Sequence, residues 1–166
     1  MNKGRVYWIT GLSGAGKTTI GTALYNKLRK RKDTVVMLDG DKLRGAYGNA
    51  FGYSAEDRER GGLCNAKLCH LLAEQGIDVV CCNIAMFDSV RDWSRVNNEK
   101  YTEVYLKVTM ETLIKRDQKG LYSSKAKNLA GVDLKVEEPK NPDVIIYNEG
   151  HEKPEDIAEK IIAIAD

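Results

Sequence analysis

The residues best suited to chemistry begin with a glycine-rich stretch near the N-terminus, "GLSGAGKTT", residues 11–19. It fits the pattern G-x-x-x-x-G-K-[ST] and stands between an apolar run and a helix-like segment, the context in which this pattern binds phosphate. Gly11, Gly14 and Gly16 allow the backbone to turn so that its N–H groups point at phosphate oxygens, beside the positive end of the following helix. We therefore predict a phosphate-binding loop.

Other residues of this loop have separate expected roles. Ser13 and Ala15 belong to the backbone that surrounds the phosphates. Lys17 is expected to reach the β- and γ-phosphates of ATP, and Thr18 to offer its hydroxyl to Mg²⁺. Thr19 is either an α-phosphate contact or simply a helix residue. The structural alternative is a glycine-rich corner that binds no nucleotide.

A second group of polar residues follows the next apolar run, in "VVMLDGDKLR", residues 35–44. A strand buried on both faces has no packing reason to end in two carboxylates. Because carboxylates repel a triphosphate unless a cation intervenes, we assign Asp39 to Mg²⁺ or its water shell. Asp41 would orient an acceptor hydroxyl and take its proton, and Arg44 would face an anionic acceptor. A further interpretation, compatible with catalysis, is that Asp41 caps a helix.

Strands and helices alternate along the chain. Strands are predicted at residues 5–10, 34–39, 77–85, 102–108 and 143–147, and helices at 16–31, 54–75, 89–98, 111–118 and 154–165. This alternation predicts an α/β fold with a doubly wound, parallel, five-stranded sheet flanked by helices, and functional loops at the carboxyl ends of the strands. A chain of 166 residues is expected to form one domain, residues 1–166.

The polar loop at residues 119–141 is long for a compact domain. It carries lysines at positions 119, 125, 127, 135 and 140. Such a loop is usually a functional lid, and the alternative is a merely solvated loop. With the end of the preceding helix, the predicted lid spans approximately residues 116–141.

Composition excludes several classes of function. The net charge of +2 gives no broad field suited to nucleic acid or to an anionic membrane. Without a long apolar run or a signal peptide, the protein is expected to be cytoplasmic. The four cysteines match no zinc spacing and are expected to be reduced. A GTP-dependent switch protein is the rival from another class, but the guanine-specifying pattern N-K-x-D is absent.

The stretches "GLSGAGKTT", "LDGDKLR", "GYSAEDR", "RDQKGLY" and "AGVD" together resemble the adenylylsulfate kinase family in order and spacing. The resemblance covers nearly the whole chain. It implies a P-loop kinase that transfers the γ-phosphate of ATP to the ribose 3′-hydroxyl of a nucleotide whose 5′-phosphate carries a second acid in anhydride linkage. It also implies a homodimer.

The resemblance also implies roles for individual residues. Asp41 is the implied base, and Arg44 and Arg58 are implied acceptor contacts. Tyr53 stands where the family has a phenylalanine that stacks on the acceptor base. Lys119 falls near the transferring phosphoryl group or the acceptor's anhydride. The other implied positions are Arg116 for ATP, and Ile84, Gly120, Leu121 and Leu129 for the acceptor.

The chain departs from the family at several acceptor positions. Gly61 replaces an asparagine, and Leu63 and Cys64 replace a pair of arginines. Ala85 and Met86 replace a serine and a proline.

In the lid, Leu129 replaces a second aromatic residue. The residues for ATP and the 3′-hydroxyl are thus kept, while those for the acceptor's base and anhydride are changed. A branch of the family that phosphorylates cytidine diphosphoramidate, for capsular polysaccharide, fits this description. We expect that acceptor, with adenylyl sulfate as the alternative.

Overall fold

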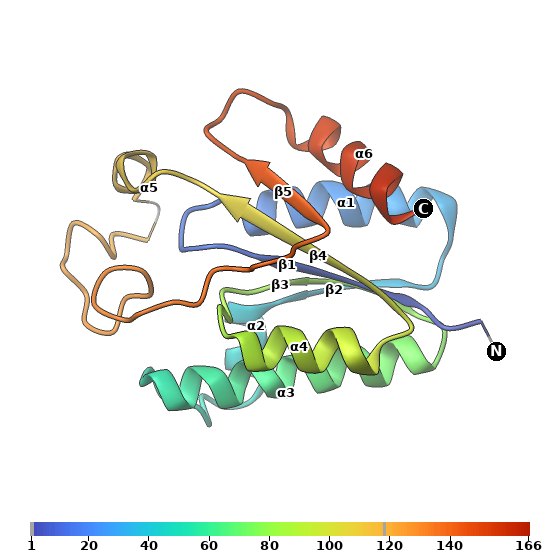
Figure 1. Ribbon diagram of the computed structural model, residues 1–166, viewed down its shortest axis with the longest axis horizontal. Coiled ribbons are helices and arrows are strands. Elements are labelled where there is room, and N and C mark those ends of the chain that lie inside the picture. Colours follow the sequence, from blue (N-terminus) through green and yellow to red (C-terminus); the bar gives the residue numbers. More distant parts are fainter. Residues whose placement is uncertain (1, 118) are drawn as a thin grey trace.

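The computed structural model describes residues 2–117 and 119–166 and contains a parallel sheet with helices on both faces (Figure 1). The strand order is β2-β3-β1-β4-β5. The strands are β1 (Arg5–Thr10), β2 (Val35–Asp39), β3 (Asp78–Cys82), β4 (Lys100–Lys107) and β5 (Val144–Tyr147). The helices are α1 (Lys17–Arg31), α2 (Gly40–Ala46), α3 (Ala55–Glu74), α4 (Asp88–Asn97), α5 (Met110–Arg116) and α6 (Pro154–Ala165). The predicted doubly wound α/β fold is confirmed.

The apolar run of β1 serves two cores, one on each face of the sheet. Tyr7 and Ile9 belong to the core under α1 and α6, whereas Val6 and Trp8 belong to the core on the side of α3 and α4. Alternate side chains of a strand point to opposite faces, so a central strand covered on both sides must be apolar throughout. This explains why the sequence of β1 shows no alternation of polar and apolar residues.

All strands are parallel, so the loops that follow them meet at one edge of the sheet, on the left in Figure 1. The phosphate-binding loop follows β1, the Asp39–Asp41 corner follows β2, and the lid lies beyond β4 and α5. After β1 the chain passes through α1 to β2, which lies on one side of β1 in the sheet. Strand β4 lies on the other side of β1. Ligands of such folds bind where the strand order reverses in this way.

Two features differ from the predicted elements. Helix α2 lies outside the five predicted helices, because glycines near both ends of this short helix conceal its periodicity. The third strand ends at Cys82 rather than at Ala85, whose positive φ of 28° is incompatible with a strand. Both differences lie at the functional edge of the sheet. No helix among the described residues is long and apolar enough to span a membrane.

Candidate active site

The phosphate-binding loop adopts the backbone conformation for which its glycines were predicted. Gly14 and Gly16 have φ angles of 84° and 96°, a region that L-residues other than glycine rarely enter. Gly16 is also crowded, since a Cβ atom there would lie 2.5 Å from Nδ2 of Asn148. The loop therefore depends on glycine at position 16 for two independent reasons.

Residues that follow β4 and β5 donate hydrogen bonds to backbone carbonyls of the phosphate-binding loop. Nδ2 of Asn148 donates to the carbonyl of Ala15 at 2.8 Å, and Arg116 donates to the carbonyl of Gly14 at 3.0 Å. Arg116 also donates to the carbonyl of Asn148 at 2.7 Å. Arg116 was predicted to bind ATP, and here it is engaged with the loop's backbone. Asn148 was missed, although a polar residue directly after a strand could have indicated it.

Lys17 is the cation at the centre of the loop. In the structure its Nζ donates to the carbonyl of Leu12 at 2.8 Å. Burial, and secondly the nearby charge of Lys119, lower the pKa of Lys17 from 10.5 to about 8. The lysine is therefore poorly solvated and ready to exchange its carbonyl partner for an anion.

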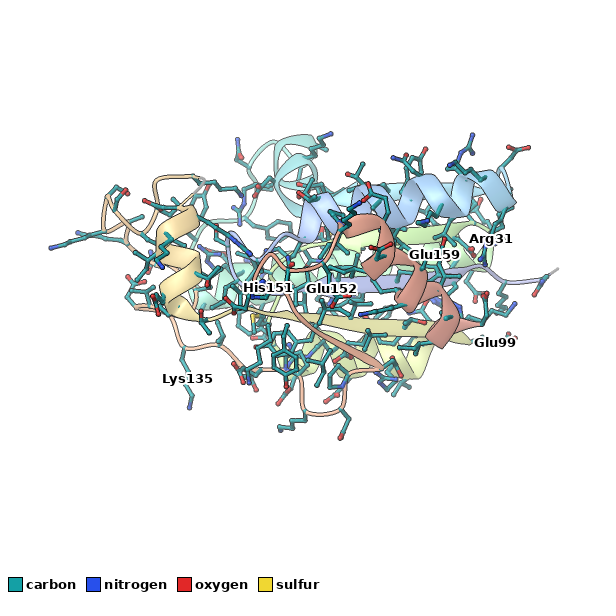
Figure 2. All side chains as sticks on the ribbon, turned by 90° about the horizontal axis from the view of Figure 1, so that it is seen from above. Arg31, Glu99, Lys135, His151, Glu152 and Glu159 are labelled. Carbon is teal, nitrogen blue, oxygen red and sulfur yellow. The ribbon has the colours of Figure 1, made fainter. Side chains whose placement is uncertain are left out.

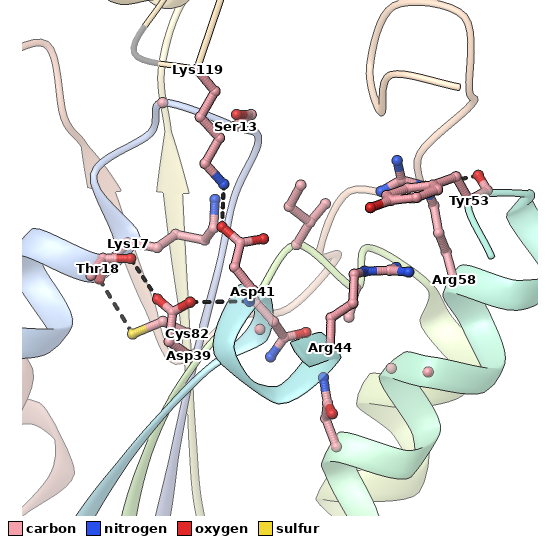
Figure 3. A pocket seen from close by; sticks show the side chains of 18 of the residues that line it. Ser13, Lys17, Thr18, Asp39, Asp41, Arg44, Tyr53, Arg58, Cys82 and Lys119 are labelled. Atoms are coloured by element: carbon pink, nitrogen blue, oxygen red, sulfur yellow. Dashed lines mark hydrogen bonds and ion pairs between the residues drawn. The ribbon is translucent and has the colours of Figure 1, made fainter. Parts of the chain in front are cut away.

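A chain of hydrogen bonds joins the loop to the acid corner (Figure 3). The hydroxyl of Thr18 donates to Oδ2 of Asp39 at 2.7 Å, and Oδ1 of Asp39 accepts from the backbone N–H of Asp41 at 3.0 Å. Asp39 is thus the N-cap of α2, and the interpretation that Asp41 is the cap is wrong. With its backbone in the first turn of α2, Asp41 has an exposed side chain that lines the cavity.

Lys119 from the lid forms an ion pair with Oδ2 of Asp41 (Figure 3). Nearby, the hydroxyl of Tyr122 donates to the carbonyl of Ser13 at 2.8 Å, so the start of the lid contacts the phosphate-binding loop. Tyr122 was not assigned a role from the sequence. By contrast, Lys135 points away from the body of the molecule (Figure 2), and Lys140 pairs with Asp88 on α4.

A cavity of about 240 Å³ brings most of the predicted residues together. Its lining includes the predicted residues Ser13, Gly14, Gly16, Lys17, Thr18, Thr19, Asp39, Asp41, Arg44, Tyr53, Arg58, Ile84, Lys119, Leu121 and Leu129. Four other predicted residues do not line the cavity: Gly11, Ala15, Arg116 and Gly120. Gly11 and Ala15 are buried residues of the loop itself, and Gly120 follows Lys119 with a φ of 63°.

Two arginines surround the exposed ring of Tyr53 at the far side of the cavity (Figure 3). The guanidinium of Arg44 lies 4.3 Å from the ring centroid, and that of Arg58 lies 5.5 Å from it. Burial, and secondly the charge of Arg44, lower the pKa of Arg58. Arg58 also donates to the carbonyl of Asn128 at 2.8 Å, which ties α3 to the lid beside Leu129.

One face of α3 lines the cavity at i, i+3, i+4 and i+7 from Arg58, a spacing that the sequence could have revealed. The residues after Arg58 on this face are Gly61, Gly62 and Asn65. Leu63 and Cys64, which stand where the family has arginines, do not line the cavity, and Leu63 packs against the core. The absence of arginines at positions 63 and 64 therefore removes no positive charge from the residues that line the cavity. Asn65, together with Asn83 after β3, was missed by sequence reasoning.

Comparison with known proteins identifies the family. The model of the adenylylsulphate kinase family matches residues 3–147. The chain is 38% identical over 165 residues to a cytidine diphosphoramidate kinase of Campylobacter jejuni, covering 97% of this chain and 96% of the relative. It is 37% identical over 152 residues to a probable adenylyl-sulfate kinase of Archaeoglobus fulgidus, covering 89% and 98%.

A solved structure of similar shape is the APS kinase of Mycobacterium tuberculosis in complex with AMPPNP and APS. Its TM-score is 0.89 at 26% identity, and the match covers 99% of this chain and 98% of that one. Family model, relatives and structure agree. The chain therefore belongs to the adenylylsulfate kinase family of P-loop kinases, enzymes that use ATP to phosphorylate a hydroxyl group.

Proposed function

We propose that this kinase transfers the γ-phosphate of ATP to the ribose 3′-hydroxyl of a nucleotide whose 5′-phosphate is part of a mixed anhydride. The observation that carries the proposal is the meeting of Lys17, Asp41 and Lys119 at one cavity between the phosphate-binding loop and the acceptor side. A cavity with a phosphate cradle at one end and an aromatic ring at the other is suited to two nucleotides bound head to head.

The chemistry requires a base, a cation and fixed positions. Asp41 accepts the proton of the attacking hydroxyl, and Lys17 stabilises negative charge on the transferring phosphoryl group. Lys119 leaves Asp41 when the acceptor hydroxyl arrives and then faces the same phosphoryl oxygens. Most of the rate acceleration comes from this positioning, because phosphoryl transfer needs little covalent participation by the protein.

The oxygen atoms at the loop fit Mg²⁺. The hydroxyl of Thr18 and the carboxylate of Asp39 lie 2.7 Å apart, and both are hard oxygen donors of the kind that this ion prefers. The described residues contain no cluster of three acidic, histidine or cysteine side chains. When bound, Mg²⁺ would neutralise charge on the β- and γ-phosphates.

Among acceptors of this class, we propose cytidine diphosphoramidate, which belongs to capsular polysaccharide synthesis. Leu129 in place of a second aromatic residue leaves Tyr53 as the stacking surface, and this suits a smaller base. Adenylyl sulfate is the second candidate, since the identities of 38% and 37% to the two kinds of relative barely differ.

The two acceptors can be compared directly with ATP and Mg²⁺ under identical conditions. We expect kcat/KM for cytidine diphosphoramidate to exceed that for adenylyl sulfate by at least about tenfold. Efficient use of adenylyl sulfate alone would refute the preferred acceptor and leave the kinase chemistry intact. Transfer to neither, with activity on a free sugar or a nucleoside monophosphate, would refute the acceptor class.

A further inference from the structure

The lid carries three residues that line the active-site cavity: Lys119, Leu121 and Leu129. Between α5 and β5 the described residues contain turns and one isolated bridge, between Ala130 and Leu134, but no helix or strand. Backbone N–H groups in such a segment need partners other than those of a helix or a sheet. Contacts of another kind must therefore fix where the three side chains lie.

The first turn of the lid is closed by Asp117, at the end of α5. Its Oδ1 accepts from the backbone N–H of Tyr122 at 3.0 Å, and its Oδ2 accepts from that of Ser123 at 3.1 Å. Hydrogen bonds to a carboxylate are stronger than those between neutral groups. Lys119, which forms the ion pair with the candidate base (Figure 3), belongs to the stretch of chain that these two bonds close. We call this stretch, residues 117–123, the base turn.

A second aspartate closes the turn at residues 128–134, which we call the tip turn. The two carboxylate oxygens of Asp133 again accept from two successive N–H groups, that of Asn128 at 2.6 Å and that of Leu129. The carbonyl of Asn128 in turn accepts from Arg58 on α3 at 2.8 Å. Leu129 is 5% exposed and lines the cavity, as Arg58 does. Asp133 is thus bonded to the part of the lid that meets the acceptor side.

The base turn and the tip turn do not hold each other. Among the described residues, no hydrogen bond joins them. A second cavity, of about 600 Å³, is lined by residues of α5 and of both turns, including Tyr122 and Val132. Elements that share the wall of a cavity have less packed contact with each other than elements with a filled interface. Each turn therefore depends on its own aspartate.

We propose that the lid consists of two separately ordered turns, each held by one aspartate that acts as a positioning residue. Asp117 holds Lys119 in place for phosphoryl transfer. Asp133 holds Leu129, and through the carbonyl of Asn128 also Arg58, in place for the acceptor. Neither aspartate lines the active-site cavity, so each acts through the residues of its turn. The inference rests on the proposed function and adds two residues to it.

The first test exchanges each carboxylate for an amide of the same size, in Asp117→Asn and Asp133→Asn. Asparagine offers one acceptor oxygen where aspartate offers two, so one of the two N–H groups loses its partner. In Asp117→Asn we expect kcat to fall about tenfold, with KM for cytidine diphosphoramidate changed less than about twofold. In Asp133→Asn we expect that KM to rise about fivefold with kcat little changed. Each variant is the matched control for the other.

A double-mutant cycle separates the positioning of Lys119 from a general loss of structure. If Asp117 acts through Lys119, Asp117→Asn should lower kcat by less than about twofold once Lys119→Ala is present. A variant that only destabilised the fold would lower kcat by the same factor with and without Lys119→Ala. The same factor in both backgrounds would therefore overturn the role of Asp117.

Amide hydrogen exchange of the free enzyme, followed by NMR, tests the two turns without any substrate. In Asp117→Asn, the two amides that Asp117 binds should exchange at least about fivefold faster, while the two that Asp133 binds keep their rates. Asp133→Asn should give the opposite pattern. Faster exchange in both turns of either variant, or in neither, would overturn the inference and leave the proposed function standing. Failure of the unmodified enzyme to phosphorylate either candidate acceptor would instead overturn the proposed function, and the exchange rates would still decide whether the turns are separate.

Discussion

The pKa of Lys17 makes ATP binding sensitive to pH. In the free protein this pKa is lowered from 10.5 to about 8, mainly by burial, so the lysine loses its charge above pH 8. Bound phosphates favour the charged form and raise the pKa again, so that ATP binding takes up a proton. We expect the affinity for ATP to fall by up to about tenfold per pH unit above pH 8.

Calorimetry at pH 7, 8 and 9 measures this effect, with Lys17→Met as the control. The variant should bind ATP weakly, transfer no phosphate and show little of the pH dependence. An ATP affinity that is constant from pH 7 to 9 would contradict the position assigned to Lys17, as would phosphoryl transfer by the variant.

Asp41 provides the second prediction at the scale of single residues. Asp41→Asn keeps the size of the side chain and removes the base, so kcat should fall by about 100-fold or more with little change in ATP affinity. Rapid-quench kinetics with saturating ATP and acceptor measure the chemical step. The control is Asp92→Asn, at an exposed acid on α4 that does not line the cavity. If Asp41→Asn retains most of its turnover, Asp41 is not the base.

At the level of secondary-structure elements, the phosphate-binding loop depends on the lid. The contact between them is the hydrogen bond from the hydroxyl of Tyr122 to the carbonyl of Ser13. Tyr122→Phe removes this bond and preserves the ring. A single hydrogen bond of this kind contributes about 0.5–1.5 kcal/mol, so KM for ATP should rise roughly two- to tenfold with kcat little changed.

Steady-state kinetics at saturating acceptor measure the effect of Tyr122→Phe, and Tyr25→Phe on α1 serves as the control. A large loss of kcat with unchanged KM would mean that the tyrosine acts in the chemical step instead.

The elements also show what could be predicted from the sequence and what could not. The loop between β1 and α1 was predictable, because its glycines and Lys17 form one contiguous pattern. Asn148 stood out only as a single polar residue after a strand, because its importance arises from its hydrogen bond to the phosphate-binding loop. The positions where the family has two arginines, residues 63 and 64, were misleading, because they lie off the face of α3 that lines the cavity. The family resemblance named positions 61, 63 and 64, and of these only Gly61 lines the cavity, together with Gly62 and Asn65 on the same face of α3.

For the whole molecule, we propose the homodimer that the family resemblance implies. Edge strand β5 leaves Ile145 and Tyr147 45% and 69% exposed, an apolar surface that a second copy could cover. Light scattering after gel filtration should give about twice the chain mass of 18.5 kDa. A single species at the mass of one chain would exclude the dimer under those conditions.

The central claim is that the cavity aligns ATP with a ribose 3′-hydroxyl. The most direct measurement is phosphorus–proton correlation NMR of the product formed from ATP and cytidine diphosphoramidate. We predict a new phosphorus resonance coupled to the ribose H3′ proton, with the 5′ anhydride and its amino group intact. A new phosphate coupled to H2′, a phosphate attached to the anhydride end, or ADP formation without a phosphorylated nucleotide would contradict the account.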